Sequence, residues 1–299
     1  MPTFLSEKYA DEKVHPDSNN SLSIFQSKND DIIGGIIKGI EAGYRHIDIC
    51  QVDGHATLIG EGIKRAIDKN LVQREDLFIT LKIWNTHLDP FHVEKGLDLV
   101  LKDAKLRYVD MLLPHFPTAF KYQETPPTYD TKNVRFLTIP LHDTWEAFEQ
   151  MVRLGKAKQI GLANFNKKQI MQLLLECNIK PSILQIESSV IFPNQDLVDF
   201  CKTQNITCYT YLPFGDTTNE VSKNIFKTPS VLSVGEKFSK TPAQICMKYC
   251  IQRDIGVIVN IAEEKAMKEY LEIFDFDVDI DDMFQISNGI EPIRTASYK

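Results

Sequence analysis

Hydrophobic residues along the chain fall into two alternating patterns. Short apolar runs rich in Ile, Val and Phe are separated by longer stretches in which apolar residues recur with a helical period. This alternation is typical of strand and helix units around a parallel sheet. The expected strands are Ser21–Phe25, Arg45–Cys50, Phe78–Trp84, Met111–Phe116, Ile160–Phe165, Leu184–Glu187, Thr207–Pro213 and Gly256–Ile261. Their number predicts an α/β fold, a (β/α)8 TIM barrel.

Helix boundaries are marked by residues that commonly cap helices. Asn166 and Thr241 stand where an N-cap is needed, Pro242 suits a first turn, and Gly155 suits a C-terminal stop. The expected helices are Phe91–Leu106, Leu141–Leu154, Lys167–Glu176 and Ala243–Gln252.

The domain organisation follows from the same rhythm. We expect residues 1–299 to form a single barrel domain, with a divergent segment at 1–20 and a short C-terminal tail at 278–299. Residues 118–138 contain two adjacent prolines and several polar residues, and they interrupt the alternation. We interpret them as a loop over the barrel mouth.

Composition narrows the class of partner. The chain has 43% hydrophobic and 25% charged residues and a formal net charge of -7. Nucleic acid and anionic membranes need a basic surface, so we expect neither as a main partner. The first residues lack the apolar core of a signal peptide, and no run approaches the roughly 18 apolar residues of a membrane span. We therefore expect a soluble, cytoplasmic protein.

The six cysteines give no sign of a metal site. They show no CxxC spacing, and no histidine accompanies the pair Cys246 and Cys250, which lies four residues apart in a helical pattern. We expect reduced, buried cysteines and no bound metal.

Four segments together are similar to one enzyme family. GYRHID begins at Gly43, LFITLKIW spans Leu77–Trp84, YVDMLLPHFP spans Tyr108–Pro117, and GLANF spans Gly161–Phe165. Their sequences and spacing resemble the aldo-keto reductase family over most of the chain. The resemblance implies a barrel of the aldo-keto reductase type, usually a monomer, and NAD(P)H-dependent reduction of small aldehydes or ketones.

The resemblance also implies roles for individual residues. Lys82 matches the family's catalytic lysine, Asp48 matches its carboxylate partner, and His115 matches the imidazole that orients the carbonyl. Trp84 stands where family members often line the substrate pocket, although a plain rim aromatic is an equal alternative.

Other matched residues would hold the nicotinamide end of the cofactor. Asn164 and Gln185 resemble the pair that binds the carboxamide, and Tyr211 resembles the aromatic that stacks on the ring. Asp48, Asn164, Gln185 and Tyr211 are therefore the candidate cofactor-binding residues.

One catalytic position departs from the family. Asp53 stands where the family has the tyrosine that donates a proton to the carbonyl oxygen. A general acid must hold its proton, and a neighbouring lysine lowers the pKa of an aspartate. We therefore expect Asp53 to be ionised and to pair with Lys82, unless burial and Asp48 outweigh the lysine.

The cofactor-binding motif departs too. Polar contacts are replaced in Ser23-Ile24, Ala163, Leu212 and Val259-Asn260-Ile261, Asp216 stands near the expected pyrophosphate, and Ala266 replaces the arginine that usually binds the adenosine phosphate. A phosphate needs Lys or Arg partners, so NADPH is disfavoured and NADH less so. Lys265 and Lys268 offer substitutes on the same expected helix.

Three kinds of function remain open from the sequence. The first is an oxidoreductase with impaired or altered activity. The second is a non-catalytic barrel of this family, a pseudoenzyme with a ligand-binding, regulatory or structural role. The third is an enzyme in which Asp48, Asp53, Lys82 and His115 transfer protons without hydride.

Overall fold

The computed structural model describes residues 22–25, 31–123, 129, 134–216, 222–260, 264–288 and 292–296. Its main strands are β1 (Leu22–Phe25), β2 (His46–Cys50), β3 (Phe78–Ile83), β4 (Val109–Pro114), β7 (Ala157–Ile160), β8 (Leu162–Ala163), β9 (Ile183–Ile186), β10 (Thr207–Thr210) and β11 (Ile255–Asn260). Each expected strand is present within a few residues of its predicted bounds. The segments form one sheet in the order β7-β4-β3-β2-β1-β11-β10-β9-β8, and its ladders are all parallel.

The sheet closes through the two segments at the ends of this order. β7 and β8 are consecutive in the chain and are separated only by Gly161. A β-carbon at Gly161 would lie 2.7 Å from the side chain of Ile183 and 2.8 Å from its carbonyl oxygen, so only glycine fits there. Because β7 pairs with β4 and β8 pairs with β9, the predicted (β/α)8 barrel is confirmed.

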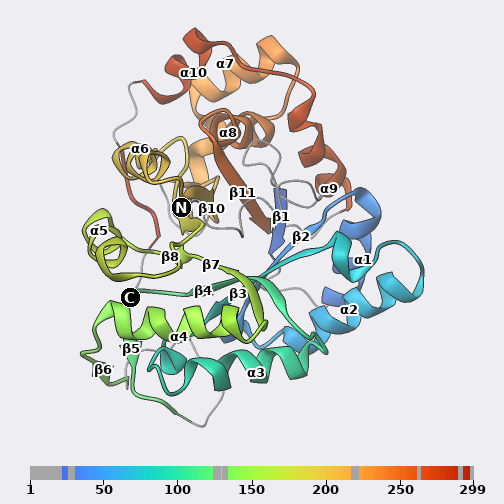
Figure 1. The fold of residues 1–299 in the computed structure, drawn as a ribbon. Helices are drawn as coiled ribbons and strands as arrows, with labels where there is room; N and C mark the ends of the chain where they lie inside the picture. Colours follow the sequence, from blue (N-terminus) through green and yellow to red (C-terminus); the bar gives the residue numbers. More distant parts are fainter. Residues whose placement is uncertain are drawn as a thin grey trace.

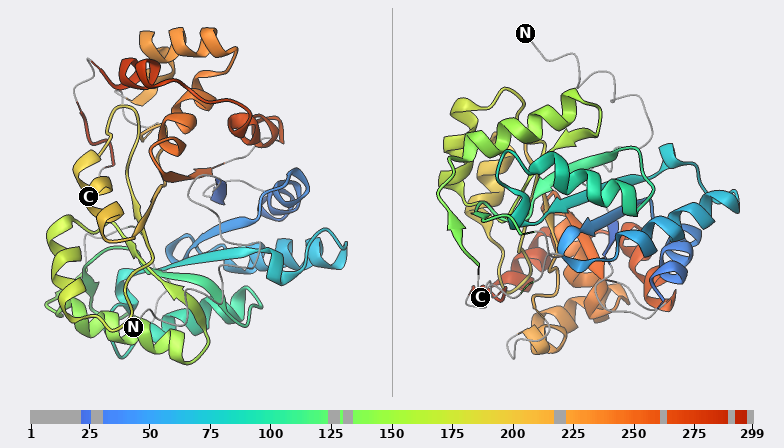
Figure 2. Two further views of the ribbon diagram at one scale, coloured as in Figure 1. Left: turned by 45° about the horizontal axis from the view of Figure 1, so that its top comes forward. Right: turned by 90° about the horizontal axis from the view of Figure 1, so that it is seen from below.

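Helices surround the strands on the outside of the barrel (Figure 1), and the other views in Figure 2 agree. They are α1 (Ile32–Ala42), α2 (Ala56–Asp68), α3 (Val93–Asp103), α4 (Leu141–Arg153), α5 (Lys167–Glu176), α6 (Gln195–Thr203), α7 (Pro229–Phe238), α8 (Pro242–Ile251), α9 (Glu264–Leu271) and α10 (Ile280–Ser287). No helix in the described part of the chain has the length and apolar composition that a membrane span requires.

The predicted caps hold two helices at their expected starts. Asn166 accepts a hydrogen bond from the backbone of Gln169 at 3.0 Å, and Thr241 accepts one from Gln244 at 3.3 Å. Helix α3 begins two residues later than expected because Asp89 accepts from the amide of Phe91 and holds a turn there.

Two regions contain structure that the sequence pattern did not predict. Residues 118–138 include a short antiparallel pair, β5 (Ala119–Phe120) with β6 (Phe136–Leu137), whose strands are too short to show a period. Residues 278–299 include α10, which packs near α7 at the top of Figure 1. The expected divergent segment at 1–20 lies outside the described residues.

The hydrophobic core has two parts, one inside the barrel and one between the strands and the helices, because successive side chains of a strand point to opposite faces. Met111 and Leu113 on β4 belong to a small cluster inside the barrel, whereas Leu112 between them belongs to the large cluster under the helices. This alternation follows from the two-residue period of a strand. It also directs alternate strand residues, including those near the carboxyl ends, toward the barrel interior.

Candidate active site

The predicted site residues lie at one end of the barrel. His115, Asn164 and Tyr211 directly follow β4, β8 and β10, while Lys82 and Gln185 lie in the last residues of β3 and β9. These are the carboxyl ends of the strands, the end at which barrel enzymes carry their chemistry. The structure therefore brings these residues to a common rim.

Asp48, Lys82 and Gln185 form a closed hydrogen-bonded triangle in the barrel interior. The Lys82 ammonium donates to Asp48 Oδ1 and, at 3.1 Å, to Gln185 Oε1. Gln185 Nε2 donates to Asp48 Oδ2 at 2.5 Å. Burial is the largest single effect on Lys82 and lowers its pKa, but the charge and hydrogen bond of Asp48 together with Cys50 outweigh burial and raise the pKa. The triangle thus keeps a positive charge inside the barrel.

His115 presents a neutral imidazole beside this charge. Its backbone amide bonds to the carbonyl of Ile83, which fixes its place at the end of β4. Burial and the nearby charge of Lys82 lower the pKa of His115 to about 3. The ring lies edge-on to Trp84 at 5.2 Å, and its buried Nδ1 has no hydrogen-bond partner. A buried polar atom of this kind is rare, and a ligand would satisfy it.

Asn164 and Tyr211 continue the rim next to His115. Asn164 has a left-handed backbone with φ of 64°, which asparagine tolerates better than most residues. Its Nδ2 donates to the carbonyl of His115 at 2.8 Å, and the Tyr211 hydroxyl donates to its Oδ1 at 2.7 Å. The amide is therefore oriented by both of its neighbours.

Asp53 ends the 3₁₀ turn Gln51–Asp53 after β2, and Gly54 follows it with φ of 70°. Lys82 forms an ion pair with Asp48, and the pairing expected between Lys82 and Asp53 stays a prediction. Our expectation of a lowered pKa is wrong. Burial raises the pKa of Asp53 and outweighs the lowering effects of the hydrogen bond from Tyr129 and of the charge on Lys82.

Sequence reasoning missed three residues near this rim. Tyr129 donates a hydrogen bond to Asp53 Oδ1 at 2.7 Å, and nothing in the polar segment around it marked it out. Cys50, which we expected only to be a reduced, buried cysteine, lies within hydrogen-bonding reach of both Asp53 and Lys82. Glu187 follows Gln185 by two residues, a spacing that points both side chains the same way and could have identified it.

Glu187 fixes the end of the chain against the barrel. Its side chain is 1% exposed and accepts from the amide and hydroxyl of Thr295, both at 2.6 Å, and from the amide of Ala296. The Thr295 hydroxyl in turn accepts from the amide of Asp216 at 2.8 Å. The described residues 292–296 therefore lie along the segment where the cofactor's pyrophosphate was expected.

The residues fit the nicotinamide end of a dinucleotide better than the phosphate end. Amide groups and an aromatic ring meet at β8, β9 and β10, as a carboxamide-bearing ring requires. At the other end Ala266 is half-buried against the core, and Lys268 is paired with Glu264 at 2.9 Å. Among the described residues no cluster of His, Cys, Asp or Glu is arranged to hold a metal ion.

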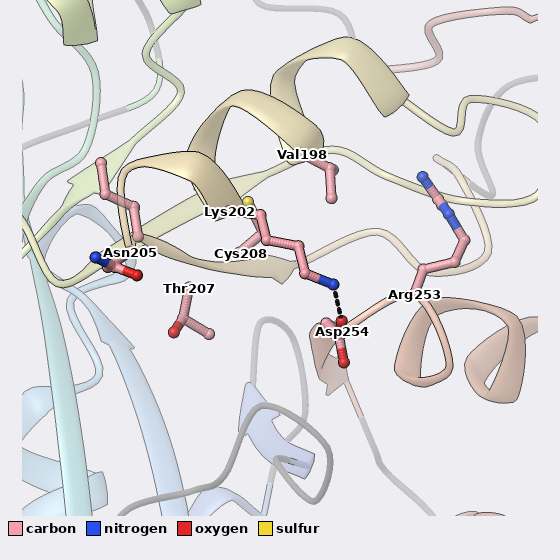
Figure 3. A pocket seen from close by; sticks show the side chains of 8 residues that line it. Val198, Lys202, Asn205, Thr207, Cys208, Arg253 and Asp254 are labelled. Atoms are coloured by element: carbon pink, nitrogen blue, oxygen red, sulfur yellow. Dashed lines mark hydrogen bonds and ion pairs between the residues drawn. The ribbon is translucent and has the colours of Figure 1, made fainter.

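A pocket of about 410 Å³ lies at the opposite end of the barrel (Figure 3). The pocket lies at the amino-terminal ends of β10 and β11, and its lining includes Lys202, Arg253 and Asp254. Lys202 pairs with Asp254 at 2.5 Å, and Arg253 donates to the carbonyl of Pro193, so its charges are satisfied internally. None of the predicted site residues lines it.

Comparison with known proteins gives the same assignment as the geometry. A sequence profile described as "Aldo/keto reductase family" matches residues 35–290. An NAD(P)H-dependent D-xylose reductase of Candida tropicalis is 36% identical over 267 residues, which cover 84% of this chain and 82% of that protein. Aldo-keto reductase family 1 member A1 of Bos taurus is 32% identical over 271 residues, covering 89% and 83%.

A solved structure agrees with this. The aldose reductase of Schistosoma japonicum superposes with a TM-score of 0.85 at 34% identity and covers 92% of this chain and 89% of its own. With its parallel barrel, its site at the carboxyl ends of the strands and these relatives, the chain belongs to the aldo/keto reductase family.

Proposed function

We propose that this chain is a nicotinamide-dependent reductase of small aldehydes and ketones whose proton delivery is altered. The observation that carries the proposal is the buried triangle of Asp48, Lys82 and Gln185 beside the neutral imidazole of His115. A positive charge and an unpartnered imidazole nitrogen in a water-poor site favour a developing negative charge on oxygen. The similar D-xylose reductase and aldose reductase support the same reaction class.

The chain's own residues would act in distinct ways. Asn164 and Gln185 would hold the carboxamide and Tyr211 would cover the ring of the cofactor, which supplies a hydride when bound. His115 is neutral across the physiological range, so it can donate one ring N–H to a carbonyl oxygen. Trp84, which is buried against His115, would shape the apolar side of the substrate pocket.

NADH suits this site better than NADPH. A 2′-phosphate requires a charge-assisted partner, and Ala266 provides none at the family's usual position. Lys268 is engaged by Glu264, and Lys265 is exposed on α9. We expect weak binding of both cofactors, with NADH ahead.

The second candidate is a barrel of this family without catalysis. The contact between Asp216 and Thr295 favours this candidate. The Thr295 hydroxyl accepts the hydrogen bond of the Asp216 amide, so this backbone donor is already occupied near the place where the pyrophosphate was expected. This candidate also accounts for the carboxylate at position 53. The expected cytoplasmic location and monomeric state stay predictions under either candidate.

Cofactor titration separates the two candidates. The chain has two tryptophans, so Trp145→Phe leaves Trp84 as the fluorescent reporter beside the site. We expect NADH to quench this fluorescence saturably at micromolar to submillimolar concentration. No quenching and no heat of binding with either cofactor at millimolar concentration would reject the reductase and leave the non-catalytic barrel.

A further inference from the structure

Tyr129 places a phenol in the space that Asp53 leaves open. Its hydroxyl donates to Asp53 Oδ1 at 2.7 Å. Its ring lies edge-on to Trp84 at 5.3 Å and to His115 at 6.4 Å. The phenol thus reaches the site from the segment between β5 and β6 and not from β2.

The surroundings of this phenol are those of a proton-transfer site. His115 offers a neutral imidazole with an unpartnered nitrogen on one side, and Asp53 offers a carboxyl group on the other. Tyr129 itself is 55% exposed, so a proton spent in the site can be replaced from solvent.

We propose that Tyr129 is the proton donor for carbonyl reduction in this chain and replaces the phenol missing at position 53. The inference rests on the proposed reductase function. It makes Tyr129 a catalytic residue and Asp53 a positioning residue that also supplies protons.

The reduction adds one hydride and one proton to the carbonyl group. The reduced nicotinamide, when bound, would supply a hydride that forms a C–H bond at the carbonyl carbon, and the C=O π electron pair would move to oxygen. That oxygen takes the hydroxyl proton of Tyr129. The phenolate oxygen then takes a proton from the carboxyl of Asp53, which solvent protonates again.

Charge at the site explains why Asp53 is needed. Burial and the Asp53 carboxylate raise the pKa of Tyr129, so the phenol alone is a poor acid. When Asp53 carries a proton it can donate to the phenol oxygen, and the phenol hydroxyl is then free to face the carbonyl. Burial, which raises the pKa of Asp53, favours this protonated form. The other charged or titratable groups that act on the pair are Cys50, Lys82 and His55 on Asp53, and Cys50 and Asp48 on Tyr129.

A matched pair of variants tests the assignment. Tyr129→Phe removes only the hydroxyl, and Tyr122→Phe makes the same change in the same insertion, where the ring stacks on His92 at 4.2 Å. Butanal reduction is followed in a single turnover with saturating NADH. We expect Tyr129→Phe to slow the step by about 10²- to 10⁴-fold without changing NADH affinity, and Tyr122→Phe to leave it unchanged.

Replacement of Asp53 gives an independent check. Asp53→Tyr restores a phenol at the family position, so we expect faster reduction and no further loss when Tyr129→Phe is added. In the unaltered protein the rate should fall as pH rises through the pKa of Asp53, because the relay needs its proton. Asp53→Asn should remove this pH dependence, which a merely structural Tyr129 would not produce.

A spectroscopic readout does not depend on turnover. With ¹³C-labelled tyrosine, the resonance lost in Tyr129→Phe identifies the phenol. Asp53→Asn should lower the pKa of the Tyr129 phenol toward that of free tyrosine. Addition of 1-butanol to the NADH complex should shift the Tyr129 resonance and leave the Tyr122 resonance in place.

The outcomes separate the two claims. Unchanged turnover in Tyr129→Phe, with cofactor binding intact, overturns the role of Tyr129 and leaves the reductase standing. Absence of NADH and NADPH binding in the unaltered protein overturns both.

Discussion

Asp48 and Lys82 face each other from neighbouring strands β2 and β3, with side chains 0% and 7% exposed. Their hydrogen bonds to Gln185 satisfy three polar side chains in the barrel interior. A buried pair of this kind is costly to break, because removal of one partner leaves a charge without water or a counterion.

We therefore expect Lys82→Met to lower the free energy of unfolding by about 3–5 kcal/mol. The double variant Lys82→Met with Asp48→Asn should be less destabilised than the sum of the two single variants, because no unpaired charge remains. Urea unfolding of the four proteins measures this. Additive losses would show that the two side chains are energetically independent.

Buried histidines should make stability depend on pH. Burial lowers the pKa of His46 from 6.5 to about 4, although Asp48 and Asp110 oppose the shift. The unfolded chain then binds more protons than the folded protein between these values, so stability is present above about pH 6.5 and is lost as pH falls toward 4. The loss amounts to about 3 kcal/mol for a group this deeply buried.

Urea midpoints across this pH range test the assignment to His46. His46→Gln should reduce the dependence of the urea midpoint on pH. Part of this dependence should remain, because the pKa values of His87 and His115 are also lowered. His142→Gln is the control, because that side chain is 48% exposed and paired with Asp143 and Glu176. An unchanged slope in His46→Gln would contradict the assignment.

Glu187 should hold the C-terminal segment in place. Glu187→Gln removes the charge that receives the Thr295 and Ala296 donors, and hydrogen bonds to charged groups contribute about 1.5–3 kcal/mol. We expect exchange of the backbone amides at 293–296 to rise by about 10- to 100-fold. Glu149→Gln is the control: this buried carboxylate receives the amides of Asn178 and Ile179, so exchange should change there and not in the tail. Equal amide exchange of the C-terminal segment in both variants would contradict the role of Glu187 in holding this segment.

The phosphate end of the site can be tested by restoring a positive charge. Ala266→Arg should tighten NADPH binding by about 10- to 100-fold through a charge-assisted contact while leaving NADH little changed. Calorimetry with both cofactors provides the comparison. If Lys265→Ala or Lys268→Ala instead weakens NADPH binding, the phosphate partner has moved to a new position on α9.

The sequence predicted what depends on local periodicity and on motif. The strands that carry Lys82 or end just before His115 and Tyr211 were predicted because apolar runs mark them. The site was predicted because the carboxyl ends of parallel strands meet at one end of a barrel. Tyr129 could not be found in this way, since a residue in a polar insertion has no period and its contact with Asp53 spans 76 positions. The pKa of Asp53 was mispredicted because burial, which decides its direction, is a property of the folded chain.

Transfer of deuterium from cofactor to substrate shows whether this chain carries out hydride transfer. The protein is incubated with D-xylose or butanal and NADH that carries deuterium at its hydride-donating carbon, and the alcohol product is examined by mass spectrometry. We expect one deuterium on the former carbonyl carbon, well above a control without protein. Absence of label under saturating cofactor would contradict a reductase built on Asp48, Lys82 and His115.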